Sequence, residues 1–164
     1  MNEDPLGRLV AFFAFAVLIV FGVSIIFSLI DHSIDTKISN ETVSFTNTCA
    51  SNGCIYPEDI YNFIGYVTRL GNYTVIIEHE SSNYFTDGNG GANKEYISHF
   101  TDEIMTSIFH TDGTQYTYEM KADDYINVTV KKNSSILTGL LDLIRGTTQS
   151  SHIIADYGAP VGQN

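Results

Sequence analysis

Two cysteines, Cys49 and Cys54, are the residues of this chain whose type and spacing most directly suggest chemistry. A disulfide between them would close a small loop and contribute about 2 kcal/mol by the chain-entropy relation. Gly53 gives this loop the backbone freedom that a tight closure needs. We expect the disulfide if the segment lies outside the cytoplasm. Two free thiols are the main alternative, and a metal or redox site is a weaker one because no histidine lies between the cysteines.

His99 and Glu103 form a second candidate pair, because they stand four residues apart in a segment, residues 95–109, with helical periodicity. A zinc site can use two such side chains. His110 follows about three turns later, but no defined further ligand and no His-Glu-x-x-His motif accompany the pair. We interpret these residues as an exposed helix face and expect no metal.

The segment from Asp87 to Asn89 resembles the start of a calcium-binding loop, since these two residues occupy its first and third positions. The sixth position is Ala92, where the motif needs glycine, and the twelfth is Ser98, where it needs glutamate. We therefore expect a flexible turn here and no calcium site.

Signatures of catalysis and of nucleic-acid binding are both missing from the sequence. The chain has no Gly-x-Ser-x-Gly elbow, no P-loop and no dinucleotide-binding glycine motif. The acidic neighbours Asp102-Glu103 and Asp123-Asp124 are interpreted as solvated faces of an acidic protein. A net charge of −11, with 8 basic and 19 acidic residues, argues against binding a phosphate backbone. We expect a non-enzymatic protein with no cofactor and no nucleic-acid partner.

Residues 9–30 form an uncharged stretch of 22 residues that is apolar except for Gly22, Ser24 and Ser28. As a helix it would extend about 33 Å, against a hydrocarbon core of about 30 Å. A cleaved signal peptide usually has a shorter apolar region and a small-residue cleavage site, which is missing after Ile30. We expect an uncleaved transmembrane helix, with a signal peptide or a buried core helix as the alternatives.

The orientation of this span depends on composition more than on charge, because the basic residues on its two sides nearly balance. The acidic C-terminal part, rich in Asn, Thr and Ser, is typical of a domain displayed outside the membrane. We expect residues 1–8 to be a short cytoplasmic segment, residues 31–157 to be an extracytoplasmic domain and residues 158–164 to be a flexible tail. The protein would then be a single-pass cell-membrane protein.

The expected fold class is α+β: a long N-terminal transmembrane helix followed by a small antiparallel sheet of three or four strands packed with helices. The helix over 57–70 has the clearest signals, since Pro57 suits its first turn and Gly71 its end. A sparse apolar stripe predicts that the first helix continues past the span until residues 47–54 break it. A loop is expected over 81–93. The remaining patterns predict helices over 95–109 and 135–144 and strands over 73–79, 114–120, 125–131 and 152–157.

A short leader-like segment, an apolar span, a continuing helix and a small α+β head follow one another in the chain. This layout is similar to that of type IV pilin-like proteins, particularly the minor pseudopilins of tight-adherence (Tad/Flp-type) pilus systems, and to related small single-pass membrane proteins of Gram-positive bacteria. The residues that carry the likeness are VSF (43–45), GCIYPEDIYNF (53–63) and YTVIIEH (73–79). The resemblance implies a possible processing site between Gly7 and Arg8. A prepilin carries glutamate five residues into the mature chain, where this sequence has Phe12.

The expected function is that of a membrane-anchored structural or assembly component of a pilus-like or secretion apparatus at the cell surface. Membrane lipid would surround residues 9–30, and small residues there would allow other helices to pack closely. The domain would present a polar, acidic surface to protein partners. The alternative function is a membrane-anchored extracytoplasmic module that binds or senses a small ligand.

Overall fold

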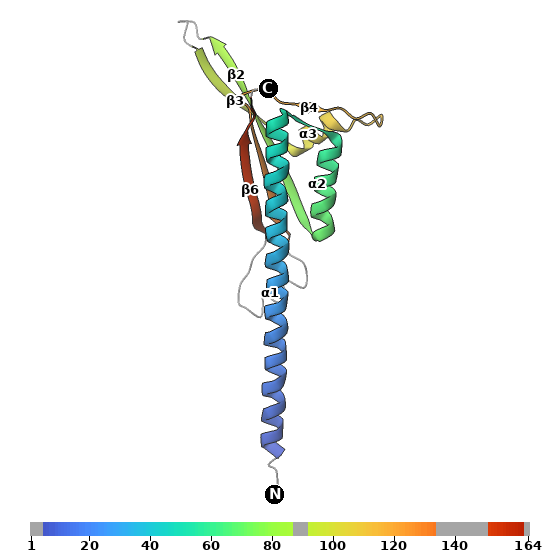
Figure 1. Cartoon of the computed structure of the whole chain (residues 1–164), viewed down its shortest axis with the longest axis vertical. Coiled ribbons are helices and arrows are strands. Elements are labelled where there is room, and N and C mark those ends of the chain that lie inside the picture. Colours follow the sequence, from blue (N-terminus) through green and yellow to red (C-terminus); the bar gives the residue numbers. More distant parts are fainter. Residues whose placement is uncertain (1–4, 87–91, 134–150, 163–164) are drawn as a thin grey trace. The chain divides into compact units, whose positions relative to one another are not determined.

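A computed structural model describes residues 5–86, 92–133 and 151–162 of the chain (Figure 1). The chain divides into two compact units, Met1–Thr36 and Lys37–Asn164. The first unit contains the N-terminal part of helix α1 (Pro5–Asn52), and the second contains the rest of α1 together with the strands and other helices that the structure describes. The α+β fold class is confirmed.

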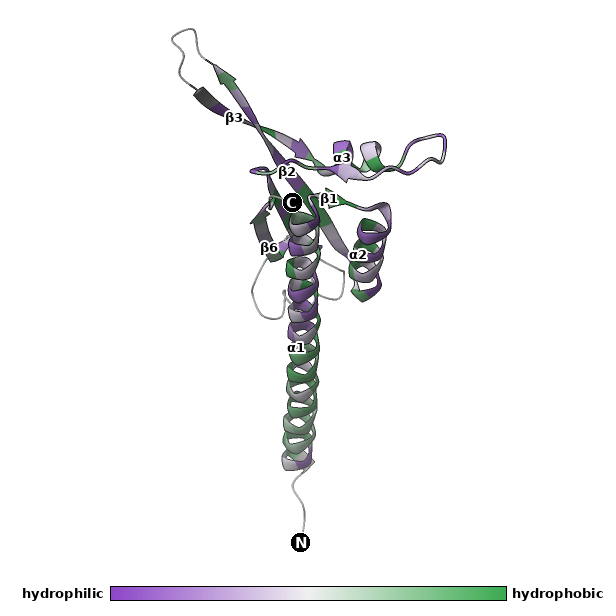
Figure 2. Cartoon of the chain, turned by 45° about the horizontal axis from the view of Figure 1, so that its top comes forward, coloured by the Kyte–Doolittle hydropathy of each residue, from purple (hydrophilic) through white to green (hydrophobic). Residues whose placement is uncertain are grey.

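Helix α1 changes character along its length (Figure 2). Every large apolar side chain from Leu6 to Ile30 is at least 45% exposed. By length and composition, α1 is able to cross a membrane. Within the second unit its buried side chains recur at helical spacing: Ile38, Thr42, Phe45, Thr46, Cys49 and Ala50.

The break expected over residues 47–54 comes later than the sequence suggested, because α1 continues to Asn52. Gly53 then adopts a left-handed backbone with φ of 66°, which favours glycine at the end of a helix. Thr42 and Thr46, both fully buried, donate their hydroxyls to the carbonyls of the residues four positions earlier. Each of these buried hydroxyls therefore has an acceptor for its hydrogen.

Four antiparallel strands form the main sheet in the order β3-β2-β5-β6. Their bounds are Tyr73–Thr86 for β2, Ala92–Phe100 for β3, Tyr125–Lys132 for β5 and His152–Pro160 for β6. Strand β2 pairs with β5 from Tyr73 to Glu80 and with β3 from Glu78 to Thr86. The alternating inward positions supply the sheet's share of the core: Ile77, Ile126, Val128, Val130, Ala155 and Ala159.

Helix α2 (Pro57–Leu70) has the bounds that the sequence predicted and buries Ile60, Phe63 and Val67. The ring of Phe63 stacks on that of Phe45 in α1, with centroids 4.4 Å apart and planes only 2° from parallel. A separate two-stranded sheet pairs β1 (Cys54–Ile55) with β4 (Tyr118–Glu119).

The largest difference from the sequence-based expectation lies in residues 95–109. The predicted helix is wrong for its first part, because residues up to Phe100 form strand β3, and only α3 (Thr101–Ile108) is helical. Tyr96 and Ile97, expected on a buried helix face, are 54% and 44% exposed. Pairing with β2, the preceding strand, supplies the backbone hydrogen bonds that a longer helix would have supplied, and the pattern within residues 95–109 does not reveal this partner.

Other segments differ in extent. Strand β2 reaches Thr86, so the expected loop over 81–93 is largely a hairpin. The expected strand over 114–120 shortens to β4 and one isolated bridge from Phe109 to Gln115. Strands β5 and β6 confirm the remaining predicted strands, and β6 extends into the segment expected to be a tail. The predicted helix over 135–144 and the calcium-like turn at 87–91 lie outside the described residues.

Candidate functional site

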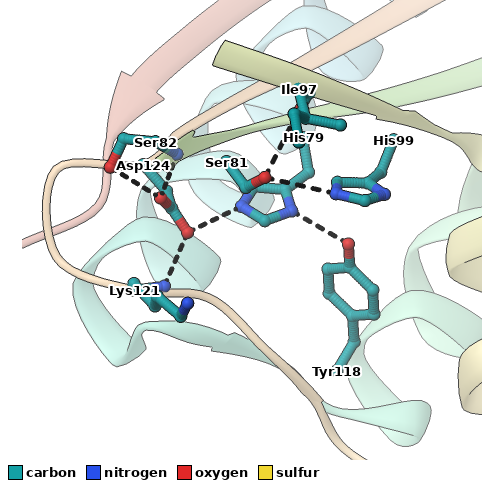
Figure 3. Close-up of polar contacts among 8 residues, drawn as sticks. All are labelled: His79, Ser81, Ser82, Ile97, His99, Tyr118, Lys121 and Asp124. Carbon is teal, nitrogen blue, oxygen red and sulfur yellow. Dashed lines mark hydrogen bonds and ion pairs between the residues drawn. The ribbon is translucent and has the colours of Figure 1, made fainter. Parts of the chain in front are cut away.

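A dense polar cluster lies where β2 passes the end of β5 and continues beside β3 alone (Figure 3). Its members come from β2, β3, β4, α3 and the connection that leads into β5. We call it the His79 cluster, defined by seven residues: His79, Ser81, Ser82, His99, Glu103, Tyr118 and Asp124.

His79 is only 3% exposed, and both of its ring nitrogens have partners. Nε2 lies 3.0 Å from Oδ2 of Asp124, and Nδ1 lies 2.9 Å from the hydroxyl of Tyr118. Because a carboxylate only accepts, Nε2 carries the hydrogen and Nδ1 accepts from Tyr118. Burial lowers the pKa of His79 below its ordinary value, although the Asp124 carboxylate acts in the opposite direction. The ring is therefore neutral at pH 7.

Asp124 is 1% exposed and accepts four hydrogen bonds. Oδ1 accepts from the backbone N–H and the hydroxyl of Ser82, at 2.8 and 3.2 Å. Oδ2 accepts from the backbone N–H of Lys121 at 2.7 Å and from His79. Burial alone would raise the pKa of Asp124, but these hydrogen bonds outweigh it and hold the pKa below its ordinary value. Asp124 is thus a buried carboxylate that stays ionised.

Tyr118, which is half-buried, is the second partner of the His79 ring. Burial, together with the charges of Glu103 and Asp124, raises the pKa of Tyr118 to about 12. Its hydroxyl stays protonated at every physiological pH and is available to donate to His79.

A second chain of contacts lies beside the first, on the same face of the hairpin formed by β2 and β3. Ser81 Oγ lies 3.2 Å from Nε2 of His99, and Nδ1 of His99 lies 2.8 Å from Oε1 of Glu103. Since the Glu103 carboxylate takes the hydrogen of Nδ1, Nε2 is left as an acceptor and competes with the Ile97 carbonyl for the single hydrogen of the serine hydroxyl. Hydroxyl, imidazole and carboxylate follow one another in the order of a nucleophile, base and acid.

Two observations favour a structural interpretation of this second chain. The side chain of Glu103 is 59% exposed, so water competes for the carboxylate that would orient the base. Ser81 Oγ also lies within 3.4 Å of the carbonyl of Ile97, its partner residue across the hairpin. We interpret the contacts among Ser81, His99 and Glu103 as polar cross-links of the hairpin.

The sequence anticipated only part of this cluster. It singled out His99 and Glu103 but placed both on one helix, whereas His99 lies at the end of β3 and Glu103 in α3. It placed Asp124 on a solvated face, which the burial of this residue contradicts. His79 was missed, and the polar residue on the inward face of an otherwise apolar strand is the signal that would have found it.

The two cysteines, predicted to form a disulfide, are free and buried in the structure, so the pairing is not confirmed. Cys49 lies in the last turn of α1 and Cys54 in β1. Burial, assisted by Asp59 and Cys54, raises the pKa of the Cys49 thiol to about 12. A thiol held in its protonated form is a poor nucleophile and a poor metal ligand. Among the described residues, no group of three or more His, Cys, Asp or Glu side chains is arranged to hold a metal ion.

Gly7 and Arg8, the predicted processing site, lie in the first turns of α1 and are exposed. The apolar stretch begins at Leu9, directly after these two residues. Cleavage between Gly7 and Arg8 would therefore place the new amino terminus at the edge of the span.

Comparisons with protein families, with curated proteins and with solved structures find no match for this chain. The resemblance to type IV pilin-like proteins therefore rests on the order of segments along the chain and on a few stretches in the first half of the domain.

Proposed function

We propose that this protein is a non-enzymatic, single-pass membrane protein that displays its α+β domain at the outer cell surface as a structural or assembly component of a pilus-like or secretion apparatus. Residues 9–30 contact lipid, residues 1–8 lie in the cytoplasm, and the domain that follows binds protein partners. No nucleic acid or cofactor takes part.

The observation that carries this proposal is the character of α1. Seventeen large apolar side chains of this helix, from Leu6 to Ile30, are exposed, which in water would be strongly unfavourable. A bilayer removes this cost, because the same side chains then lie in hydrocarbon. Further along the same helix, side chains such as Ile38 and Phe45 are buried in the core of the domain. One helix thus serves both as an anchor and as a core element.

The polar cluster supports a non-enzymatic role. The hydrogen-bonding nitrogens of His79 and the oxygens of Asp124 are occupied within the protein, so neither group is available to a substrate. The net charge of −11 favours partners with basic surfaces. In this proposal the surface of the domain recognises protein partners, and the His79 cluster stabilises the folded domain.

Two measurements on native membranes test the proposal. Salt-washed membranes should retain the full-length protein, and cross-linking followed by affinity purification should recover components of one membrane assembly. N-terminal sequencing of the retained protein separates two routes: a start at Arg8 supports a pilin-like route, whereas an intact N-terminus supports a plain anchor. Recovery of the protein in the soluble fraction would contradict the anchor, and thermal stabilisation of the purified protein by a small compound would favour the sensing alternative.

A further inference from the structure

The His79 side chain joins strands β2 and β4, which belong to different sheets in the described part of the chain. Strand β2 belongs to the four-stranded sheet and β4 to the two-stranded sheet, and these sheets share no strand. The hydrogen bond from Tyr118 to His79 links them, while the bond from His79 to Asp124 holds the connection into β5 (Figure 3). The His79 ring also stacks on His99 of β3, with centroids 5.6 Å apart and planes 22° from parallel.

The contacts of His79 match the single donor and single acceptor of a neutral ring. A neutral imidazole offers one donor, used by Asp124, and one acceptor, used by Tyr118. A protonated ring has two donors, so the Tyr118 hydroxyl would have to turn and accept in place of donating. The added charge would also lie in a buried position beside a second imidazole, that of His99.

The charged and titratable groups that face His79 come from three elements and from the connection into β5. Asp124 precedes β5 and attracts a cation, but its oxygens already accept three other hydrogen bonds. Glu103 of α3 also attracts a cation, from a more distant and exposed position, while His99 of β3 opposes a second positive charge. Tyr118 of β4 stays neutral. Attraction by the two carboxylates therefore competes with the cost of a buried cation.

We propose that His79 is an acid-sensitive clasp: uptake of a proton by its buried ring weakens the contacts that join β2 to β4 and to the connection into β5, so that mild acid loosens the domain. As the pH falls below about 6.5, the ordinary value for histidine, the unfolded chain takes up the proton at this residue before the folded chain does. The free energy of unfolding therefore falls with pH in this range. Above about pH 6.5 the contacts of the neutral His79 ring contribute fully to the free energy of unfolding.

Thermal unfolding of the full-length protein in detergent micelles tests this proposal. Between pH 7.5 and pH 5.5 we expect the unfolding midpoint of the wild-type protein to drop by about 3 °C or more. The variant His79→Gln keeps one donor and one acceptor but has no proton to gain, so its drop should be clearly smaller. His152→Gln, at an exposed position on β6, is the matched control and should retain the wild-type drop. A full acid-induced drop in His79→Gln would overturn the proposal.

A second measurement needs no variant. The ring protons of His79, followed by NMR in the micelle-bound wild-type protein, should show a titration midpoint below pH 6.5. A midpoint at or above pH 6.5 would overturn the proposal, because protonation would then stabilise the folded state.

Discussion

Asp123 and Asp124 are neighbours in the sequence but have opposite environments. Asp124 is buried and accepts four hydrogen bonds, whereas Asp123 is exposed and accepts one from the Tyr84 hydroxyl at 3.3 Å. In Asp124→Asn an amide N–H₂ would replace one carboxylate oxygen and face backbone or side-chain donors. We expect a loss of about 2–3 kcal/mol in the free energy of unfolding, as for other buried hydrogen bonds to charged groups. Denaturant titration measures the change.

Asp123→Asn is the control for this substitution. Asp123 has a φ of 70°, a left-handed conformation that asparagine tolerates well. We expect a change within about 0.5 kcal/mol of zero. Equal losses at the two positions would mean that the buried hydrogen bonds of Asp124 contribute little.

Ser81 carries a second prediction at this scale. If its contacts with His99 serve the hairpin alone, a fluorophosphonate probe should not label the full-length protein at pH 7.5, because no activated serine is present. Mass spectrometry of the treated protein detects such labelling. Labelling of the wild-type protein that disappears in Ser81→Ala would contradict the structural interpretation and identify a reactive nucleophile.

The residues of the cluster could be found only in part from the sequence, for a physical reason. His99 and Glu103 attract notice by their spacing, which suits a helix as well as the turn from β3 into α3. His79 and Asp124 are 45 residues apart and meet only because β2 and β5 pair in one register. A one-residue slip of that register would turn His79 to the opposite face. Local patterns contain no information about this choice.

At the scale of elements, the accuracy of prediction follows how local the stabilising contacts are. Helix α2 has a proline at its start, acids in its first turn and an apolar face at helical spacing, and its observed bounds agree with the prediction. Strand β3 has none of these local signals. Its residues are largely exposed and form a strand because β2 provides a partner, so a helix was the better local guess.

The stacked rings of Phe45 and Phe63 give a prediction for the packing of α1 on α2. Both rings are buried, at 6% and 2% exposure, and lie parallel. Phe45→Leu keeps most of the apolar volume but removes the ring contact. We expect a loss of about 1–2 kcal/mol in the free energy of unfolding, from the stacking and the partial loss of volume. Denaturant titration of the full-length protein in micelles measures it.

The neighbouring Ser44 provides the control, since it lies on α1 but is exposed. Ser44→Ala should change the free energy of unfolding by no more than about 0.5 kcal/mol. If the leucine variant were as stable as this control, the aromatic pair would not contribute to the contact between the helices.

At the scale of the whole molecule, composition predicted more than any motif did. The uncharged stretch within residues 9–30 lies in a helix with exposed apolar side chains, and the remaining sequence yields an α+β domain with its own core. Both outcomes depend on hydropathy summed over many residues, which tolerates errors at single positions. The function cannot be predicted from such a sum over many residues. It would have to be identified from a specific motif, and no motif in this sequence identifies a partner.

The proposed orientation leads to a prediction that uses the burial of the native cysteines. Cys49 and Cys54 are 1% and 8% exposed, so a membrane-impermeant maleimide should label the native protein slowly. In intact cells the variant Asn83→Cys, at an exposed position of β2, should be labelled quickly if the domain lies outside, as proposed. Leu6→Cys, which the proposed orientation places in the cytoplasm, should be labelled only after permeabilisation. If Leu6→Cys were labelled in intact cells and Asn83→Cys only after permeabilisation, the domain would lie in the cytoplasm, where surface assembly is impossible. If neither variant were labelled before permeabilisation, the protein would lie in an internal membrane.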